Sequence, residues 1–167
     1  MKAKKAILII ICVILVALIG RPILGHLYKM NYFSVYGVRL RSSHEAVIYR
    51  LGDPIDIRIS DDGNFGSFYY DGVVFHVLGL NHISPPGSVD SIWITNPNIT
   101  LGRHRIGVGS TREEVEQVGW NRWPLFLTRN SFDDAFMVSI THDSEAIWFY
   151  FDENDIVYEI RINFNST

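Results

Sequence analysis

The chain has 167 residues, of which 13% are aromatic, and a formal net charge of −3 at pH 7. This length allows one ordinary domain or two small ones, and the composition argues against long disordered tracts. From residue 31 onward, ten arginines and no lysine accompany all eighteen carboxylates. An acidic region without a basic stripe argues against a nucleic-acid-binding protein.

The N-terminus carries Lys2, Lys4 and Lys5, followed by the uncharged apolar run Ala6–Gly20 and then Arg21. A run that is apolar on every side and follows lysines is typical of a signal peptide or a membrane anchor, not of an amphipathic core helix. Fifteen residues form a helix of roughly 22 Å, which is shorter than a hydrocarbon core of about 30 Å. The short length favours a cleaved signal peptide.

The residues after the run favour an anchor that is kept. Cleavage after Gly20 would leave Leu18 at the −3 position, where signal peptidases need a small residue, and apolar residues continue as far as Leu27. We therefore expect a hydrophobic N-terminal helix that enters the membrane through residues 6–27. The lysines place the N-terminus in the cytoplasm and residues 31–167 outside, as a single-pass cell-membrane protein. If the segment is cleaved, the protein is secreted.

Cys12 is the only cysteine, and it lies inside the apolar run. The rest of the chain therefore has no disulfide, no thiol nucleophile and no cysteine metal cluster. Residues 1–36 as a whole are interpreted as cytoplasmic lysines, signal-anchor segment and juxtamembrane spacer.

Residues 37–95 predict a first α+β module. A short helix begins after Ser43 at the N-cap, runs to Leu51 and ends at Gly52. The strictly alternating segment 54–60 predicts a half-buried strand, and segments 67–71, 73–78 and 89–95 predict three more. One helix would thus cover an antiparallel sheet of about four strands.

Residues 96–104 are interpreted as a linker and residues 105–167 as a second α+β module of the same order. Thr111 caps a helix over 112–118, and segments 123–128, 136–141, 146–151 and 156–163 predict strands. A shift of 68 positions lays Val89–Thr95 on Val157–Asn163, which indicates a duplication. The expected fold class is α+β: an N-terminal hydrophobic helix followed by two tandem modules, each a short helix packed on its own sheet.

Alternation and helical periodicity predict which side chains form the two cores. For the first module these are Val47, Leu51, Ile55, Ile57, Ile92 and Ile94; for the second they are Val115, Val118, Leu125, Leu127, Ile147, Phe149, Ile160 and Ile162.

The same alternation leaves Trp93, Trp148, Tyr150 and Arg161 on the sheet face away from the helices. Trp, Tyr and Arg are the residue types enriched at binding hot spots, so these four are the candidate partner-binding face. The alternative is that the two sheets pack face to face, or that a loop covers the aromatic residues.

The segment Ile106–Val115 (IGVGSTREEV) resembles the start of modules in the β-lactamase inhibitor protein family, and it is also similar to the small outer-membrane lipoproteins of the β-barrel assembly machinery. The pattern from Ile147 to Ile160 and the Leu51–Pro54 sequence LGDP extend this resemblance over residues 37–163. It implies a non-catalytic, protein-binding tandem outside the cytoplasm. Two departures matter: the chain lacks the disulfides of the inhibitors and the lipidated cysteine of the lipoproteins. Inhibition of a β-lactamase is therefore not carried over.

None of the six histidines shows a metal-ligand spacing, and no nucleophile or phosphate-binding motif occurs. We expect no catalytic residue, no metal and no cofactor, and a protein as the partner. The leading hypothesis is a membrane-anchored or secreted protein-interaction module that binds or inhibits an envelope or secreted protein. Two alternatives remain open: a cell-envelope assembly or structural factor, and an enzyme or small-ligand sensor.

Overall fold

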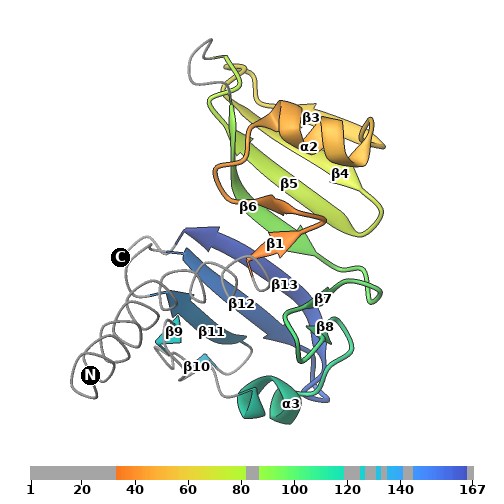
Figure 1. The fold of residues 1–167 in the computed structure, drawn as a ribbon, viewed down its shortest axis with the longest axis vertical. Helices are drawn as coiled ribbons and strands as arrows, with labels where there is room; N and C mark the ends of the chain where they lie inside the picture. Colours follow the sequence, from red (N-terminus) through yellow and green to blue (C-terminus); the bar gives the residue numbers. More distant parts are fainter. Residues whose placement is uncertain are drawn as a thin grey trace, which may run out of the picture.

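The structure is a computed structural model, and it describes residues 33–81, 87–118, 125–126, 131–132, 135–140 and 145–164. These residues are mostly β (Figure 1). The two described helices are α2 (His44–Leu51) and α3 (Arg112–Gln117). The strands are β1 (Ser34–Val35), β2 (Val38–Arg39), β3 (Asp56–Ile59), β4 (Phe65–Tyr70), β5 (Val73–Leu78), β6 (Ser88–Ile94), β7 (Thr100–Leu101), β8 (Ile106–Gly107), β9 (Leu125–Phe126), β10 (Ser131–Phe132), β11 (Ala135–Ile140), β12 (Glu145–Phe151) and β13 (Val157–Phe164).

Nine strands form one antiparallel sheet in the order β10-β11-β12-β13-β6-β5-β4-β3, with β9 also paired to β11. The central join is between β6 and β13, where Ile92 lies opposite Ile162 and Trp93 lies opposite Arg161. The predicted fold class is therefore wrong. The chain does not form two tandem α+β modules with separate sheets, because the last strands of the two halves pair with each other and merge them into one mainly β sheet.

A local feature does recur at the predicted spacing of 68 residues, just before each helix. The N–H of Arg41 donates to the carbonyl of Val89 (2.7 Å), and the N–H of Gly109 donates to the carbonyl of Val157 (2.8 Å). Both donor residues have a positive φ, 65° and 93° respectively. The recurrence thus concerns the way each helix is attached to the last strand of its half.

Both helices begin at the residues predicted from their caps. The Ser43 hydroxyl accepts from the N–H of Ala46 (3.2 Å). Thr111 and Glu114 form a capping box, in which each side chain accepts from the other residue's backbone N–H. Gly52, with a φ of 78°, ends α2 as expected. These side chains satisfy N–H groups that a helix leaves without an intrahelical partner.

The sheet face below the helices is a continuous apolar surface. One row of directly opposed residues crosses five strands, and all its members are at most 4% exposed: Phe68, Phe75, Ile92, Ile162 and Ile147. Val47 of α2 and Val115 of α3 are fully buried in the same core cluster. The predicted core positions that are fully buried, and thus confirmed, are Val47, Ile92, Ile94, Val115, Ile147, Phe149, Ile160 and Ile162.

Two short hairpins, β1–β2 and β7–β8, add further buried side chains to this core. Their buried members are Phe33, Val35, Val38 and Leu40 in the first and Ile99, Leu101 and Ile106 in the second. Phe33 and Val35 fall in the predicted spacer, and Ile99 and Leu101 fall in the predicted linker. Both segments therefore contribute to folding and do more than connect.

The first strand of the predicted first module is exposed. Ile55 and Ile57 were expected in the core, yet they are 77% and 44% exposed. Among the described strands, β3 pairs with β4 alone and lies at one end of the sheet. The N-terminal end of α2 contacts β4, where the ring of His44 stacks over Phe68 at 6.3 Å. Because β3 is an edge strand with a described neighbour on one side only, its isoleucines stay in contact with solvent.

The expectation of a single-pass membrane protein also needs correction. Within the part of the chain that the structure describes, no helix is long and apolar enough to span a bilayer. The run Ala6–Gly20, the segment 6–27 and the expected N-terminal hydrophobic helix all lie outside the described residues.

We expect the Ile92→Ala substitution to lower the free energy of unfolding by about 2–5 kcal/mol, because it leaves a cavity in the central row of the core. The matched change Ile57→Ala removes the same atoms from a strand that is partly in solvent, so it should cost less than about 1 kcal/mol. Urea denaturation followed by circular dichroism measures both. Because β6 and β13 share one core face, a single transition is expected. Equal losses for the two variants, or two separate transitions of which Ile92→Ala moves one, would contradict this description.

Candidate functional site

The predicted partner-binding residues lie on the sheet face opposite the helices. Trp148 of β12 is directly opposite Arg161 of β13, and Arg161 is directly opposite Trp93 of β6. Tyr150 follows Trp148 by two residues and shares its face. We call these four residues the aromatic–arginine cluster. Because the halves share one sheet, they do not pack face to face, and the alternative of two stacked sheets over this cluster is wrong.

The guanidinium of Arg161 is held between two aromatic rings. Its Cζ atom lies 4.1 Å from the centroid of the Trp93 ring and 4.6 Å from that of the Tyr150 ring. Its Nε donates to Oε1 of Glu159 at 2.5 Å. Each cation–π contact contributes from about 0.5 kcal/mol where it is exposed to about 2 kcal/mol where it is desolvated. Three contacts on one side chain therefore fix the guanidinium in place.

The cluster is fixed but not buried. The Arg161 side chain is 32% exposed, and Trp93, Trp148 and Tyr150 are each half-buried. A planar cation with five N–H donors, of which Nε already bonds to Glu159, keeps further donors for another molecule. The arrangement can thus present two flat aromatic surfaces around a pre-positioned hydrogen-bond donor.

The structure adds a residue that sequence reasoning did not place in the site. The ring of His76 meets the ring of Trp93 edge-on, with centroids 4.4 Å apart, and it stacks on Phe65 at 5.6 Å. Its Nδ1 lies 2.9 Å from the hydroxyl of Ser67. The sequence contained part of this information, because alternation within β5 places His76 on the opposite face from the buried Phe75. The contact of His76 with Trp93 also depends on the pairing of β5 with β6, which the sequence did not show. His76 therefore supports the cluster from the side of β5.

His76 is 9% exposed, and its Nε2 has no hydrogen-bond partner among the described residues. Burial lowers the pKa of His76 below its ordinary value, and the positive charge of Arg161 lowers it further, while Asp90 acts in the opposite direction. The neutral imidazole is the form that fits beside the Arg161 guanidinium.

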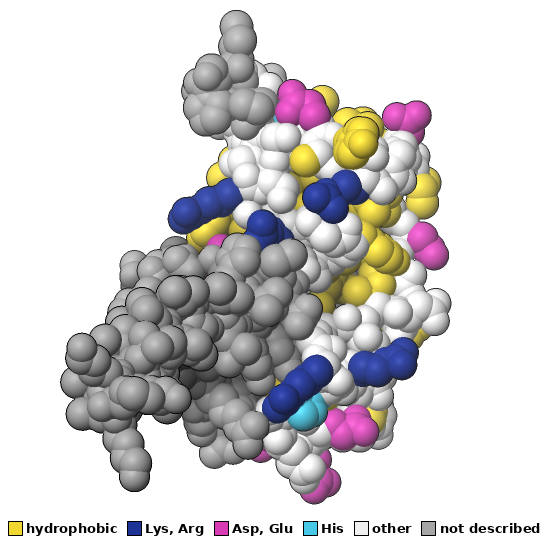
Figure 2. Space-filling view, in the orientation of Figure 1, with side chains coloured by type: hydrophobic (Ala, Val, Ile, Leu, Met, Phe, Trp, Pro, Cys, Tyr) yellow, Lys and Arg dark blue, Asp and Glu magenta, His cyan; other side chains and the backbone are white. Residues whose placement is uncertain are grey.

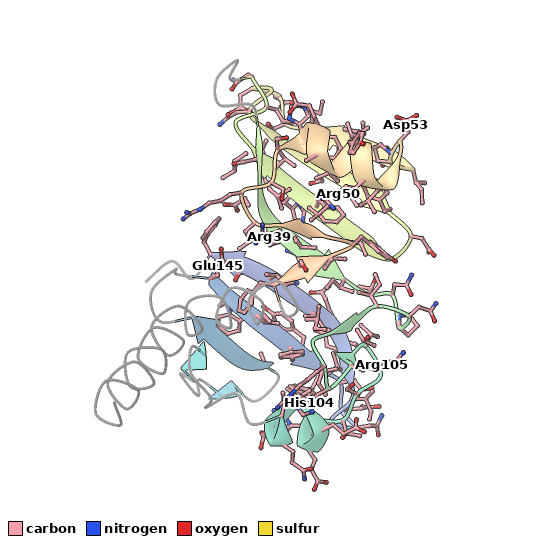
Figure 3. The ribbon with its side chains drawn as sticks, viewed as in Figure 1. Arg39, Arg50, Asp53, His104, Arg105 and Glu145 are labelled. Carbon is pink, nitrogen blue, oxygen red and sulfur yellow. The ribbon has the colours of Figure 1, made fainter. Side chains whose placement is uncertain are left out.

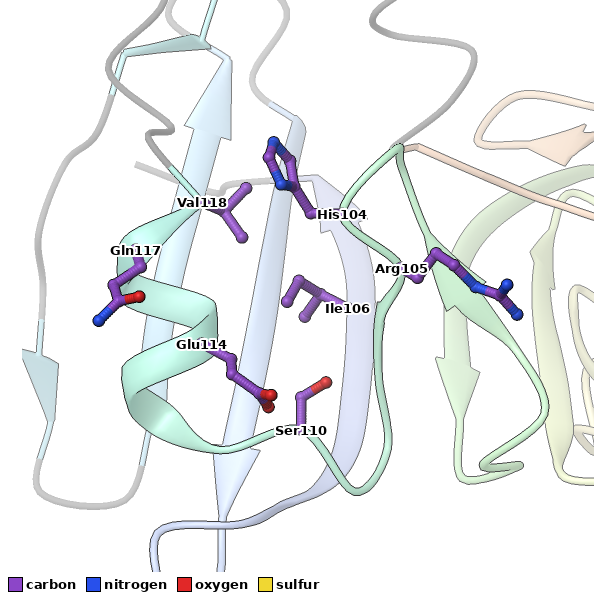
Figure 4. Close-up of a pocket in the computed structure, with 7 residues that line it drawn as sticks. All are labelled: His104, Arg105, Ile106, Ser110, Glu114, Gln117 and Val118. Atoms are coloured by element: carbon purple, nitrogen blue, oxygen red, sulfur yellow. The ribbon is translucent and has the colours of Figure 1, made fainter.

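The pocket drawn in Figure 4 is an alternative site, on the helix-covered side of the molecule. It has a volume of about 300 Å³ and is lined by His104, Arg105, Ile106, Ser110, Glu114, Gln117 and Val118. Two of its polar side chains serve the local fold. Glu114 accepts from the N–H of Thr111 (2.8 Å), and the Ser110 hydroxyl accepts from the N–H of Gly107 (3.1 Å).

A second pocket of about 300 Å³ lies where the two halves of the sheet meet. Figure 3 shows Arg39 and Glu145 near each other in this region, and Leu40, Arg41 and Ser42 complete the lining. Glu145 is only 6% exposed. Arg39 and Arg41 line the same pocket.

Within the described ranges, no group of three or more His, Cys, Asp or Glu side chains is arranged to hold a metal ion. The expectation of no metal and no cofactor stays a prediction.

No family model and no curated protein matches the chain. Among solved structures, the chain is similar to a cysteine-rich secretory protein from Staphylococcus aureus subsp. aureus Mu50, with 12% sequence identity and a TM-score of 0.52. The similarity covers 81% of this chain and 49% of that chain, so this chain spans about half the length of the protein it matches. At this identity the similarity concerns the fold alone.

We expect the stability of the fold to fall as the pH drops below about 6.5, because the unfolded state then binds a proton that the buried His76 resists. The stability that neutral His76 contributes is fully present above the pKa that this histidine has in the unfolded chain. It is lost as the pH falls towards the lower pKa of His76 in the folded chain. Thermal melts between about pH 7.5 and 5 measure it. The His76→Phe variant should lose this part of the pH dependence, whereas His104→Gln, at an exposed histidine, should retain it. The same acid sensitivity in His76→Phe and in the parent chain would rule out His76 as its source.

Proposed function

We propose that the chain is a non-catalytic protein-binding module and that the aromatic–arginine cluster, Trp93, Trp148, Tyr150 and Arg161, is its contact surface. One observation carries the proposal: the Arg161 guanidinium is held between Trp93 and Tyr150 while all three side chains stay partly exposed. Trp, Tyr and Arg dominate binding hot spots because they combine large apolar area with directed hydrogen bonds.

The fixed positions of the side chains in the cluster support a role in binding. Fixing a long side chain such as Arg costs about 0.5–1.5 kcal/mol when it happens on association. Here the rings and Glu159 hold the guanidinium beforehand, so a partner avoids most of that cost. The free donors suit a carboxylate or carbonyl oxygen, and the flanking rings suit apolar groups beside it. The expected partner surface is an acidic or carbonyl-rich site within an apolar patch.

Two acceptors of the Figure 4 pocket are already engaged, Glu114 in the cap of α3 and Ser110 in the preceding turn, which supports a non-catalytic role. The resemblance of Ile106–Val115 to modules of a family of protein inhibitors agrees with a binding role, although it names no partner.

A photo-crosslinking amino acid in place of Tyr150, in the full chain within its host cell, identifies the partner. The matched control is the same amino acid at Tyr49, which is 92% exposed and lies on α2, on the other face of the sheet. We expect a defined crosslinked product at position 150 and none at position 49.

With the identified partner purified, we expect Trp93→Ala to raise the dissociation constant at least thirtyfold, because truncating a hot-spot aromatic costs about 2 kcal/mol or more. Tyr49→Ala should leave the dissociation constant unchanged. Titration calorimetry measures both, and circular dichroism checks that each variant is folded. Equal dissociation constants for Trp93→Ala and Tyr49→Ala would refute the assignment of the binding face.

A further inference from the structure

The free edge of β3 is an apolar strand edge in contact with solvent. Among the described strands β3 pairs only with β4, and Figure 1 shows it at the far end of the sheet from β10. Ile55, Ile57 and Ile59 are 77%, 44% and 60% exposed. Unpaired edges with exposed apolar residues are templates for a further strand.

The backbone of β3 directs hydrogen-bonding groups towards this edge. The N–H of Ser60 donates to the carbonyl of Phe65 at 2.9 Å, so Ser60 belongs to the residues that bond to β4. Because backbone groups alternate in direction along an antiparallel strand, Arg58 also bonds to β4. Ile57 and Ile59 consequently point their N–H and C=O groups outwards. The N–H of Ile55 is used, since it donates to the carbonyl of Tyr69 at 2.8 Å.

We propose that two copies of the chain pair antiparallel through β3, about a two-fold axis at Ile57. In this register Ile57 faces Ile57 of the second copy and the two residues exchange N–H···O=C hydrogen bonds. A two-fold contact uses the same patch on both copies, so its residues must be self-complementary.

Charge selects this register over its neighbours. Asp56 and Arg58 flank Ile57 on the helix-free face, with side chains 53% and 71% exposed. Within one copy Arg58 Nε donates to Oδ2 of Asp56 at 3.2 Å, so pairing between copies would exchange or extend this ion pair. With the axis at Ile57, Asp56 of each copy lies opposite Arg58 of the other, at the close spacing of a pair that is not hydrogen-bonded. An axis at Asp56 would oppose two carboxylates, and an axis at Arg58 would oppose two guanidinium groups.

Both ends of α2 make their contacts with the sheet on β4, one strand in from the edge. The N-terminal end of α2 contacts β4 through His44 and Phe68, and its C-terminal end does so through a hydrogen bond from the Tyr70 hydroxyl to the carbonyl of Gly52 (3.0 Å). Figure 2 shows hydrophobic side chains exposed in this part of the helix-covered face. Pairing at β3 would place the aromatic–arginine clusters of both copies on the same side of one continuous sheet.

Sedimentation velocity of the full chain tests the proposal, between about 1 and 500 µM, the range that covers weak association through a small interface. A non-ionic detergent keeps the apolar run 6–20 from driving association. We expect a monomer–dimer equilibrium in the parent chain. Asp56→Arg alone and Arg58→Asp alone should each raise the dimer dissociation constant about tenfold or more, since each puts like charges opposite. The double variant Asp56→Arg/Arg58→Asp restores opposite charges and should return the constant to the parent value.

Ile57→Lys should abolish the dimer, because it places two ammonium groups against each other at the axis. Glu116→Arg, on the exposed surface of α3, is the matched control for a charge change and should have no effect. Circular dichroism confirms that each variant is folded. A monomer at every concentration overturns the proposal. Association that the single charge changes and Ile57→Lys leave unchanged, or that the double variant does not restore, overturns it as well.

Discussion

The pairing of β6 with β13 is the interaction on which the rest of the structure depends. It joins the last strand of each half, and it sets Ile92 against Ile162 on one face and Trp93 against Arg161 on the other. A slip of one residue would turn the whole set of one strand to the opposite face and expose buried isoleucines. The apolar row therefore fixes the register, and the register brings the guanidinium to the indole. The register of β6 and β13 therefore determines both the packing of the core and the geometry of the candidate site.

The same constraint explains why the aromatic–arginine cluster is rigid although it is partly exposed. His76 reaches Trp93 from β5, and Arg161 reaches it from β13, so the indole is supported from two neighbouring strands. Burial, against the opposing effect of Asp90, lowers the pKa of His76, and the Arg161 charge lowers it further; this disfavours a second cation beside the Trp93 ring. A surface whose side chains are already ordered loses little entropy on binding. This is the physical reason to regard it as a contact surface.

Alternation in the sequence predicted the two faces correctly for β6, β12 and β13, because each of these strands has neighbours on both sides. It failed for Ile55 and for Ile57 of β3, which have the same pattern as a core strand. Alternation tells which way a side chain points, but burial depends on what covers it, and a local pattern does not contain that information. For the same reason it could not show that β6 and β13 pair: strand edges carry backbone groups that look alike in every sequence. The caps at Ser43 and Thr111 were predictable because capping is local.

The two strand junctions, one within the chain and one proposed between copies, divide their side chains in the same way. Where β6 pairs with β13, isoleucines oppose each other on the covered face, and Arg161 contacts Trp93 on the helix-free face. At β3 the same rule would set Ile57 against Ile57 on the covered face and Arg58 against Asp56 on the helix-free face. The difference lies in burial: Ile92 and Ile162 are fully buried, whereas Ile57 is 44% exposed. Apolar area removed from water sets the strength of each junction, so the first holds the fold together and the second would be weak and dependent on concentration.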